Sequence, residues 1–168
     1  RVARLLQAIP QWPDRQRREF MAYLPERLGV PLPAQPPAEY APLRWDEVRA
    51  MRAHGIEFGS HTKTHPILPR VESADVLAEE LRHSKQRIEE ELQAPVHYFC
   101  YPNGDWDQRT VEGVSAAGYS LAVTTQWGRN LRWGSPYLLE RSPADPSWPL
   151  PYFQEVAAFG YPWRQEAS

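Results

Sequence analysis

Helix-type and strand-type segments alternate along the chain after residue 44, and this alternation constrains the fold more than any other feature of the sequence. Parallel strands joined by crossovers of about 10–20 residues predict a parallel α/β sheet or barrel. In such folds ligands bind at the carboxyl ends of the strands. We expect helices at 45–55, at 74–92 after Ser73, between Asp107 (or Asp105) and Gly118, and at 151–160, and strands at 56–61, 96–102, 120–125 and 137–142.

The first 43 residues follow a different pattern. Apolar residues at helical spacing predict a helix over 2–29, broken or kinked at Pro25. Residues 30–43 are rich in proline and form the expected connector. We therefore divide the chain into a helical segment with its connector, 1–43, and one compact α/β unit, 44–168.

Composition excludes several classes of function. The chain has 168 residues and a net charge of -2 without a basic stripe, so we expect no binding to nucleic acid. No apolar run approaches the roughly 20 residues that a membrane span needs. Cys100 is the one cysteine, so no internal disulfide forms and the redox compartment stays open.

Two polar clusters follow expected strands. The first, GSHTKTHP at 59–66, places His61 and His65 four residues apart, and neutral imidazoles suit zinc and similar divalent metals. Taken alone, this spacing fits a hydrogen-bonded polar turn as well as half of a metal site. The second, CYPNG at 100–104, turns the chain sharply and can present backbone N–H groups to an oxyanion. An ordinary strand-to-helix turn with an aspartate cap explains it as well.

Together the two clusters resemble motifs of the polysaccharide deacetylases, the family four carbohydrate esterases. HTKTH followed by HPIL matches the family's histidine motif, CYPNG its aromatic turn motif, and GYSLAVTTQWGRN the segment after that turn. The resemblance covers about residues 44–160. It implies a distorted (β/α) barrel, incomplete in this chain, that follows an N-terminal helical segment.

The same resemblance implies a site and a reaction. His61 and His65 would bind a divalent metal, usually zinc, and the N–H of Asn103 would stabilise the oxyanion. Tyr101, Pro102 and Gly104 would shape the acetate pocket. The reaction would be metal-assisted hydrolysis of acetyl groups, mostly N-linked, on a polysaccharide or glycan. Family habit favours the cell envelope or the exterior, and the chain carries no export signal that confirms it.

The sequence departs from the family's pattern at three places. The Asp–Asp motif, which supplies the catalytic base and the third metal ligand, is absent, so we expect a preceding portion of the same protein to carry it. Cys100 replaces the arginine of the turn motif, and Arg141 is a candidate substitute from a neighbouring strand. No late histidine follows His97, and Asp145 with Trp148 only faintly resembles the late Asp–Trp motif. Alternatives are therefore an inert carbohydrate-binding relative and a metal-free α/β domain.

Overall fold

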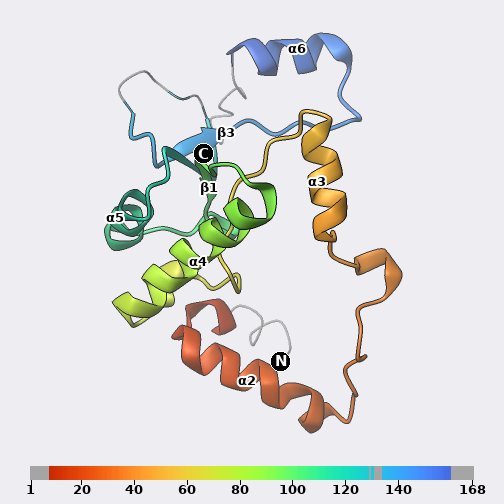
Figure 1. The fold of residues 1–168 in the computed structure, drawn as a ribbon, viewed down its shortest axis with the longest axis vertical. Coiled ribbons are helices and arrows are strands. Elements are labelled where there is room, and N and C mark those ends of the chain that lie inside the picture. The colour runs from red at the N-terminus through yellow and green to blue at the C-terminus, as the bar shows by residue number, and fades with distance from the viewer. Residues whose placement is uncertain (1–7, 129, 131–133, 160–168) are drawn as a thin grey trace, which may run out of the picture.

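A sheet of three parallel strands forms the centre of the molecule (Figure 1). The computed structural model describes residues 8–128, 130 and 134–159. The strands β1 Tyr98–Cys100, β2 Leu121–Trp127 and β3 Leu139–Arg141 follow one another in space in their chain order, which confirms the predicted parallel α/β class. The helices are α2 Asp14–Leu28, α3 Trp45–Ala53, α4 Ala74–Leu92, α5 Gln108–Ala116 and α6 Leu150–Phe159, with single 3-10 turns η1 Ile9–Gln11, η2 Ala38–Tyr40, η3 Leu68–Arg70 and η4 Pro102–Gly104.

Helices α4 and α5 cover one face of the sheet. The Ser73 hydroxyl accepts the N–H of Val76 and begins α4, and the Asp107 carboxylate accepts the N–H of Thr110 and begins α5, both as the sequence predicts. The apolar stripe of α4 then packs on the sheet and on α5. The buried core consists of Leu68, Val71, Leu77, Leu81, Val96, Phe99, Tyr101, Val114, Tyr119 and Ala122.

No described helix covers the opposite face of the sheet. In the β1–β2 register Tyr98 pairs with Leu121 and Cys100 with Val123, and all four line an open groove of 560 Å³. Tyr98 is 38% exposed. Because parallel sheets are normally covered on both faces, this open face is the inner surface of an incomplete barrel.

Three details differ from the sequence-based expectation. The strand predicted at 56–61 is reduced to one parallel bridge between Ser60 and Phe99, since this edge segment pairs with β1 alone among the described residues. Of the helix predicted at 2–29, residues 2–7 lie outside the described part and Ala8 is helical, but η1 and Pro13 interrupt the α-helix before α2 starts at Asp14. Helix α2 does not break at Pro25 but continues to Leu28, where Gly29 adopts a left-handed conformation and ends it.

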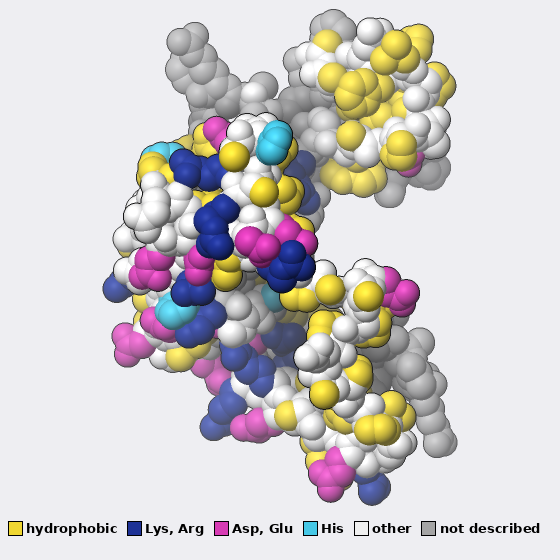
Figure 2. Space-filling model, turned by 45° about the vertical axis from the view of Figure 1, so that its right-hand side comes forward, with side chains coloured by type: hydrophobic (Ala, Val, Ile, Leu, Met, Phe, Trp, Pro, Cys, Tyr) yellow, Lys and Arg dark blue, Asp and Glu magenta, His cyan; other side chains and the backbone are white. Residues whose placement is uncertain are grey.

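Helix α6 lies apart from the core at the end of the described chain (Figure 1). Hydrophobic side chains gather over it in Figure 2, at upper right, and Leu150 and Phe153 are exposed there. In the part of the chain that the structure describes, no helix combines the length and the apolar character needed to cross a bilayer.

Candidate metal and active site

The histidine loop, residues 60–65, is attached to the edge of the sheet. The Ser60 N–H donates to the Tyr98 carbonyl at 2.8 Å, and the Cys100 N–H donates to the Ser60 carbonyl at 2.9 Å. The loop therefore leaves the sheet beside the carboxyl end of β1, close to the turn that follows this strand. This arrangement brings together the two polar clusters that the sequence places at strand ends.

The rings of His61 and His65 lie next to each other. Their centroids are 4.8 Å apart with an interplanar angle of 76°, and both residues are exposed. His61 Nδ1 lies 2.7 Å from the Cys100 carbonyl oxygen. Since a carbonyl oxygen only accepts, Nδ1 carries a proton, so the neutral ring has its lone pair on Nε2, the tautomer in which Nε2 can bind a metal.

Two imidazoles of this kind fit a zinc ion as two of its ligands. Among the described residues, however, no group of three or more His, Cys, Asp or Glu side chains is placed to hold one ion. Within the described part, the structure thus brings two candidate ligands together, His61 and His65, and places no third His, Cys, Asp or Glu beside them.

The turn η4 presents the backbone of Asn103. This residue has φ 57 and ψ 0, an unusual conformation for a non-glycine residue, and its carbonyl accepts the Thr125 hydroxyl at 3.1 Å. Its N–H donates no hydrogen bond to any described residue. Gly104 follows with φ +79, and a Cβ there would collide with the Thr125 side chain and lie 2.8 Å from its backbone nitrogen. The turn therefore holds one free N–H in a fixed place.

Tyr101 and Pro102 support this turn from inside the protein. Both are buried, and the Tyr101 ring packs edge-on against Phe99 with centroids 5.2 Å apart. Burial, with a smaller effect of Tyr137, raises the pKa of Tyr101, and its hydroxyl has no partner among the described residues. The ring of Tyr101 belongs to the core, so it shapes a pocket only through its backbone.

Arg141 and the half-buried Cys100 lie on the open face of the sheet. Both line the groove that also contains His61. Arg141 is exposed and forms no ion pair with a described residue. The Arg141 guanidinium is therefore available on the same face of the sheet as Cys100, which stands in place of the arginine of the turn motif.

The other histidines and the late aspartate have local roles. His54 ends α3 with Nδ1 2.9 Å from the Ala50 carbonyl, His83 lies 3.3 Å from Glu79, and His97 lies 3.4 Å from the Ser120 hydroxyl. The Asp145 carboxylate accepts the Ser147 N–H and hydroxyl, and these bonds lower its pKa. None of the four joins the histidine loop.

One residue near the site escapes sequence reasoning. Glu80, on α4, is 4% exposed and accepts hydrogen bonds from the histidine loop. Its sequence signal is its position between Leu77 and Ser84 on the buried stripe of the helix, where a carboxylate needs a partner.

Comparison with known proteins agrees with this geometry. The sequence profile of the polysaccharide deacetylase family matches residues 17–122. The chain belongs to the polysaccharide deacetylase family. The matched range contains the histidine loop and the η4 turn, and it also includes α2 from its fourth residue, Arg17, onward.

Individual family members are similar over part of their length. The chain is 27% identical over 101 residues to the Bacillus subtilis (strain 168) protein YxkH, whose name places it provisionally among the polysaccharide deacetylases; the match covers 60% of this chain and 36% of YxkH. The Streptococcus pyogenes deacetylase PplD, solved with acetate, has a TM-score of 0.58 at 28% identity, over 62% of this chain and 46% of PplD. The Bacillus cereus polysaccharide deacetylase BC0361 has a TM-score of 0.55 at 30% identity, over 62% of this chain and 33% of BC0361. The chain thus spans less than half the length of each of these relatives.

Proposed function

We propose that this chain carries half of the metal site of a deacetylase that removes N-acetyl groups from a polysaccharide or glycan. The observation that supports the proposal is the hydrogen bond between His61 Nδ1 and the Cys100 carbonyl, which leaves Nε2 free beside the His65 ring. A divalent ion such as zinc, bound by both imidazoles, would polarise an amide carbonyl and lower the pKa of a bound water.

The chain's own residues would act on the substrate as follows. The free N–H of Asn103 would donate to the oxygen of the acetyl group as negative charge develops on it. Thr125 and Gly104 hold this N–H in place, so no reorganisation is needed during the reaction. Arg141, on the groove face beside Cys100, would pair with the carboxylate of the catalytic base and orient it.

A portion of the protein outside this chain would supply that base and the third ligand. Two observations motivate this step: the uncovered inner face of the sheet, and the absence of a third metal ligand among the described residues. A parallel strand added at the Ser60 edge of the sheet, closing the barrel further around this face, would end beside the histidine loop, since neighbouring parallel strands end at one edge. Action on an envelope or extracytoplasmic polymer is part of the proposal and follows the family's habit.

A second candidate function is that of an inert carbohydrate-binding relative. The two-ligand site favours it, because catalytic zinc sites have three protein ligands. The two candidates differ in their dependence on the histidines, since binding of glycan to an inert relative needs neither imidazole.

Acetate release by the full-length protein from N-acetylated oligosaccharides tests the proposal. With zinc present, His61→Ala and His65→Ala should each lower kcat/KM by at least about 100-fold, because each removes a metal ligand. His83→Ala, an exposed histidine on α4, is the matched control and should leave the rate unchanged. Equal rates in all four proteins, or glycan binding without any acetate release, would contradict the deacetylase proposal.

A further inference from the structure

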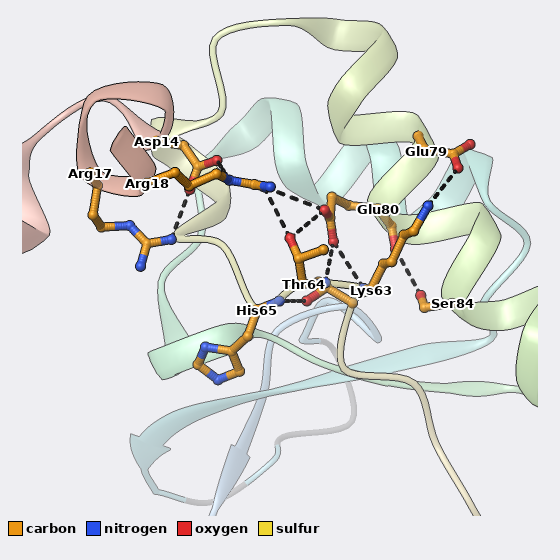
Figure 3. Close-up of polar contacts among 10 residues, drawn as sticks. Asp14, Arg17, Arg18, Lys63, Thr64, His65, Glu79, Glu80 and Ser84 are labelled. Atoms are coloured by element: carbon orange, nitrogen blue, oxygen red, sulfur yellow. Dashed lines mark hydrogen bonds and ion pairs between the residues drawn. The ribbon is translucent and has the colours of Figure 1, made fainter. Parts of the chain in front are cut away.

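A buried carboxylate on α4, that of Glu80, lies against the histidine loop (Figure 3). Glu80 Oε2 accepts the backbone N–H groups of Lys63 at 2.9 Å and of Thr64 at 2.8 Å. Its Oε1 accepts the Thr64 hydroxyl at 2.6 Å. The Glu80 side chain is 5% exposed, so these bonds form out of contact with bulk water, where they are strong.

The loop needs such support because its backbone is strained at two positions. Thr62 has φ 70 and His65 has φ 55, a region that costs a β-branched or bulky residue free energy. Such conformations persist only where the surroundings enforce them. The His65 N–H donates to the Thr62 hydroxyl at 3.0 Å, and the two residues between them donate to Glu80.

Helix α4 also holds the start of the loop. The Ser60 hydroxyl donates to the Ser84 hydroxyl at 2.8 Å, and Ser84 donates in turn to the Glu80 carbonyl at 2.8 Å. Ser84 is one helical turn after Glu80, so a single face of α4 fixes the loop on both sides of His61.

A cation from the N-terminal helix completes the cluster. Arg18 Nη2, on α2, donates to the Thr64 hydroxyl at 3.0 Å and lies 3.5 Å from Glu80 Oε1. The buried Asp14 accepts Arg18 Nε at 2.5 Å and orients the guanidinium. By contrast, Lys63 Nζ points to the exposed Glu79, at 3.3 Å (Figure 3). Arg18 is therefore the cation that faces the buried carboxylate.

We propose that Glu80 is the positioning residue of the histidine loop and that Arg18 couples α2 to it. Glu80 fixes the backbone of Lys63 and Thr64, and this backbone sets where the His61 and His65 rings lie relative to each other. The inference rests on the proposed function for its metal, but the contacts that define the role belong to the chain alone.

Zinc titration of the chain, followed by the histidine ring signals in NMR spectra, tests the role. Glu80→Ala should raise the Kd for zinc by about 10–100-fold, as loss of the partners of metal ligands does. Glu80→Gln should stay within about threefold of the wild type, because its amide oxygen still accepts the two N–H groups while its NH₂ faces the Thr64 hydroxyl. Glu79→Ala is the matched control and should bind zinc like the wild type, since among the described residues Glu79 contacts only the exposed side-chain ends of Lys63 and His83 and not the loop backbone.

Hydrogen exchange of the Lys63 and Thr64 amides, measured without metal, gives a second readout. Both amides should exchange roughly tenfold faster in Glu80→Ala, and at the wild-type rate in Glu79→Ala. Arg18→Gln removes only the contact from α2, and it should raise the zinc Kd by about two- to fivefold.

The outcomes separate this inference from the proposed function. A folded Glu80→Ala protein with unchanged zinc Kd or unchanged amide exchange would overturn the inference. A Glu80→Gln protein that binds zinc as weakly as Glu80→Ala would also overturn it. If Glu80→Ala does not fold, an unchanged zinc Kd in Arg18→Gln would overturn it. A wild-type chain that binds no zinc would overturn the proposed function, and amide exchange alone would then decide whether Glu80 positions the loop.

Discussion

Gly104 is the position in the candidate site where substitution should be least tolerated. Gly104→Ala meets two costs. The left-handed backbone, φ +79, costs a non-glycine residue about 1–2 kcal/mol. The new Cβ would also overlap Thr125, at 2.7 Å from its Cβ and 2.8 Å from its backbone nitrogen, and overpacking of this kind costs about 1–3 kcal/mol. We expect the free energy of unfolding to fall by about 2–5 kcal/mol.

Gly55 offers a matched control. Its φ of +88 is similar, and a Cβ there would meet no atom within 4 Å. Gly55→Ala should therefore lower the free energy of unfolding only by the backbone cost, about 1–2 kcal/mol. Urea denaturation of both variants, followed by circular dichroism, measures the difference. Equal losses in the two variants would refute the close approach of η4 to β2, and with it the fixed placement of the Asn103 N–H.

Three further predictions concern single side chains. Tyr101→Phe should leave stability unchanged or raise it by about 1 kcal/mol, because the buried hydroxyl has no partner among the described residues. Tyr119→Phe should lower stability by about 1 kcal/mol, because that hydroxyl donates to the Leu81 carbonyl. Urea denaturation of the two variants and the wild type measures both effects. For Glu89, burial acts to raise the pKa, but hydrogen bonds from Lys85 and a backbone N–H outweigh it and lower the pKa below its ordinary value of 4.5. The stabilising contribution of Glu89 is thus present above pH 4.5 and is lost as the pH falls through the lower native pKa. The difference in stability between the wild type and Glu89→Gln should therefore shrink in acid. A constant difference from pH 3 to 7 would contradict this. Arg141→Gln should change stability by less than about 0.5 kcal/mol but lower kcat of the full-length protein about 10–100-fold, and an unchanged kcat would remove Arg141 from the site.

The elements with strong local signals could be predicted from the sequence. The leucine stripe of α4 and its Ser73 cap, and the Asp107 cap of α5, depend on neighbours within one or two helical turns, and all are observed. The strand at 56–61 depends on a neighbour on each side, and among the described residues it pairs with β1 alone, so one bridge at Ser60 remains. The helix through Pro25 is a second case in which local propensity did not decide the structure.

In the candidate site, too, the residues in short contiguous motifs could be predicted, whereas those that depend on distant contacts could not. The histidine pair and the η4 turn are contiguous motifs, so the sequence located them and the parallel topology brought them together. The contacts of Glu80 and Arg18 with the loop join residues 16 and 46 positions apart, and no local pattern indicates such contacts. The burial of the Tyr101 ring, one residue after β1, likewise continues the alternation of faces of that strand, which the short motif does not reveal.

The central claim is that His61 and His65 bind one metal ion together through free ring nitrogens. Long-range ¹H–¹⁵N spectra of the chain, recorded during addition of zinc, test it directly because they report each ring nitrogen of the five histidines. We predict that His61 Nε2 and one nitrogen of His65 shift in parallel up to one equivalent, while His61 Nδ1 keeps its proton and the other three histidines stay unchanged. Separate shifts of His61 and His65 at different zinc concentrations, or a metal on His61 Nδ1, would contradict the account.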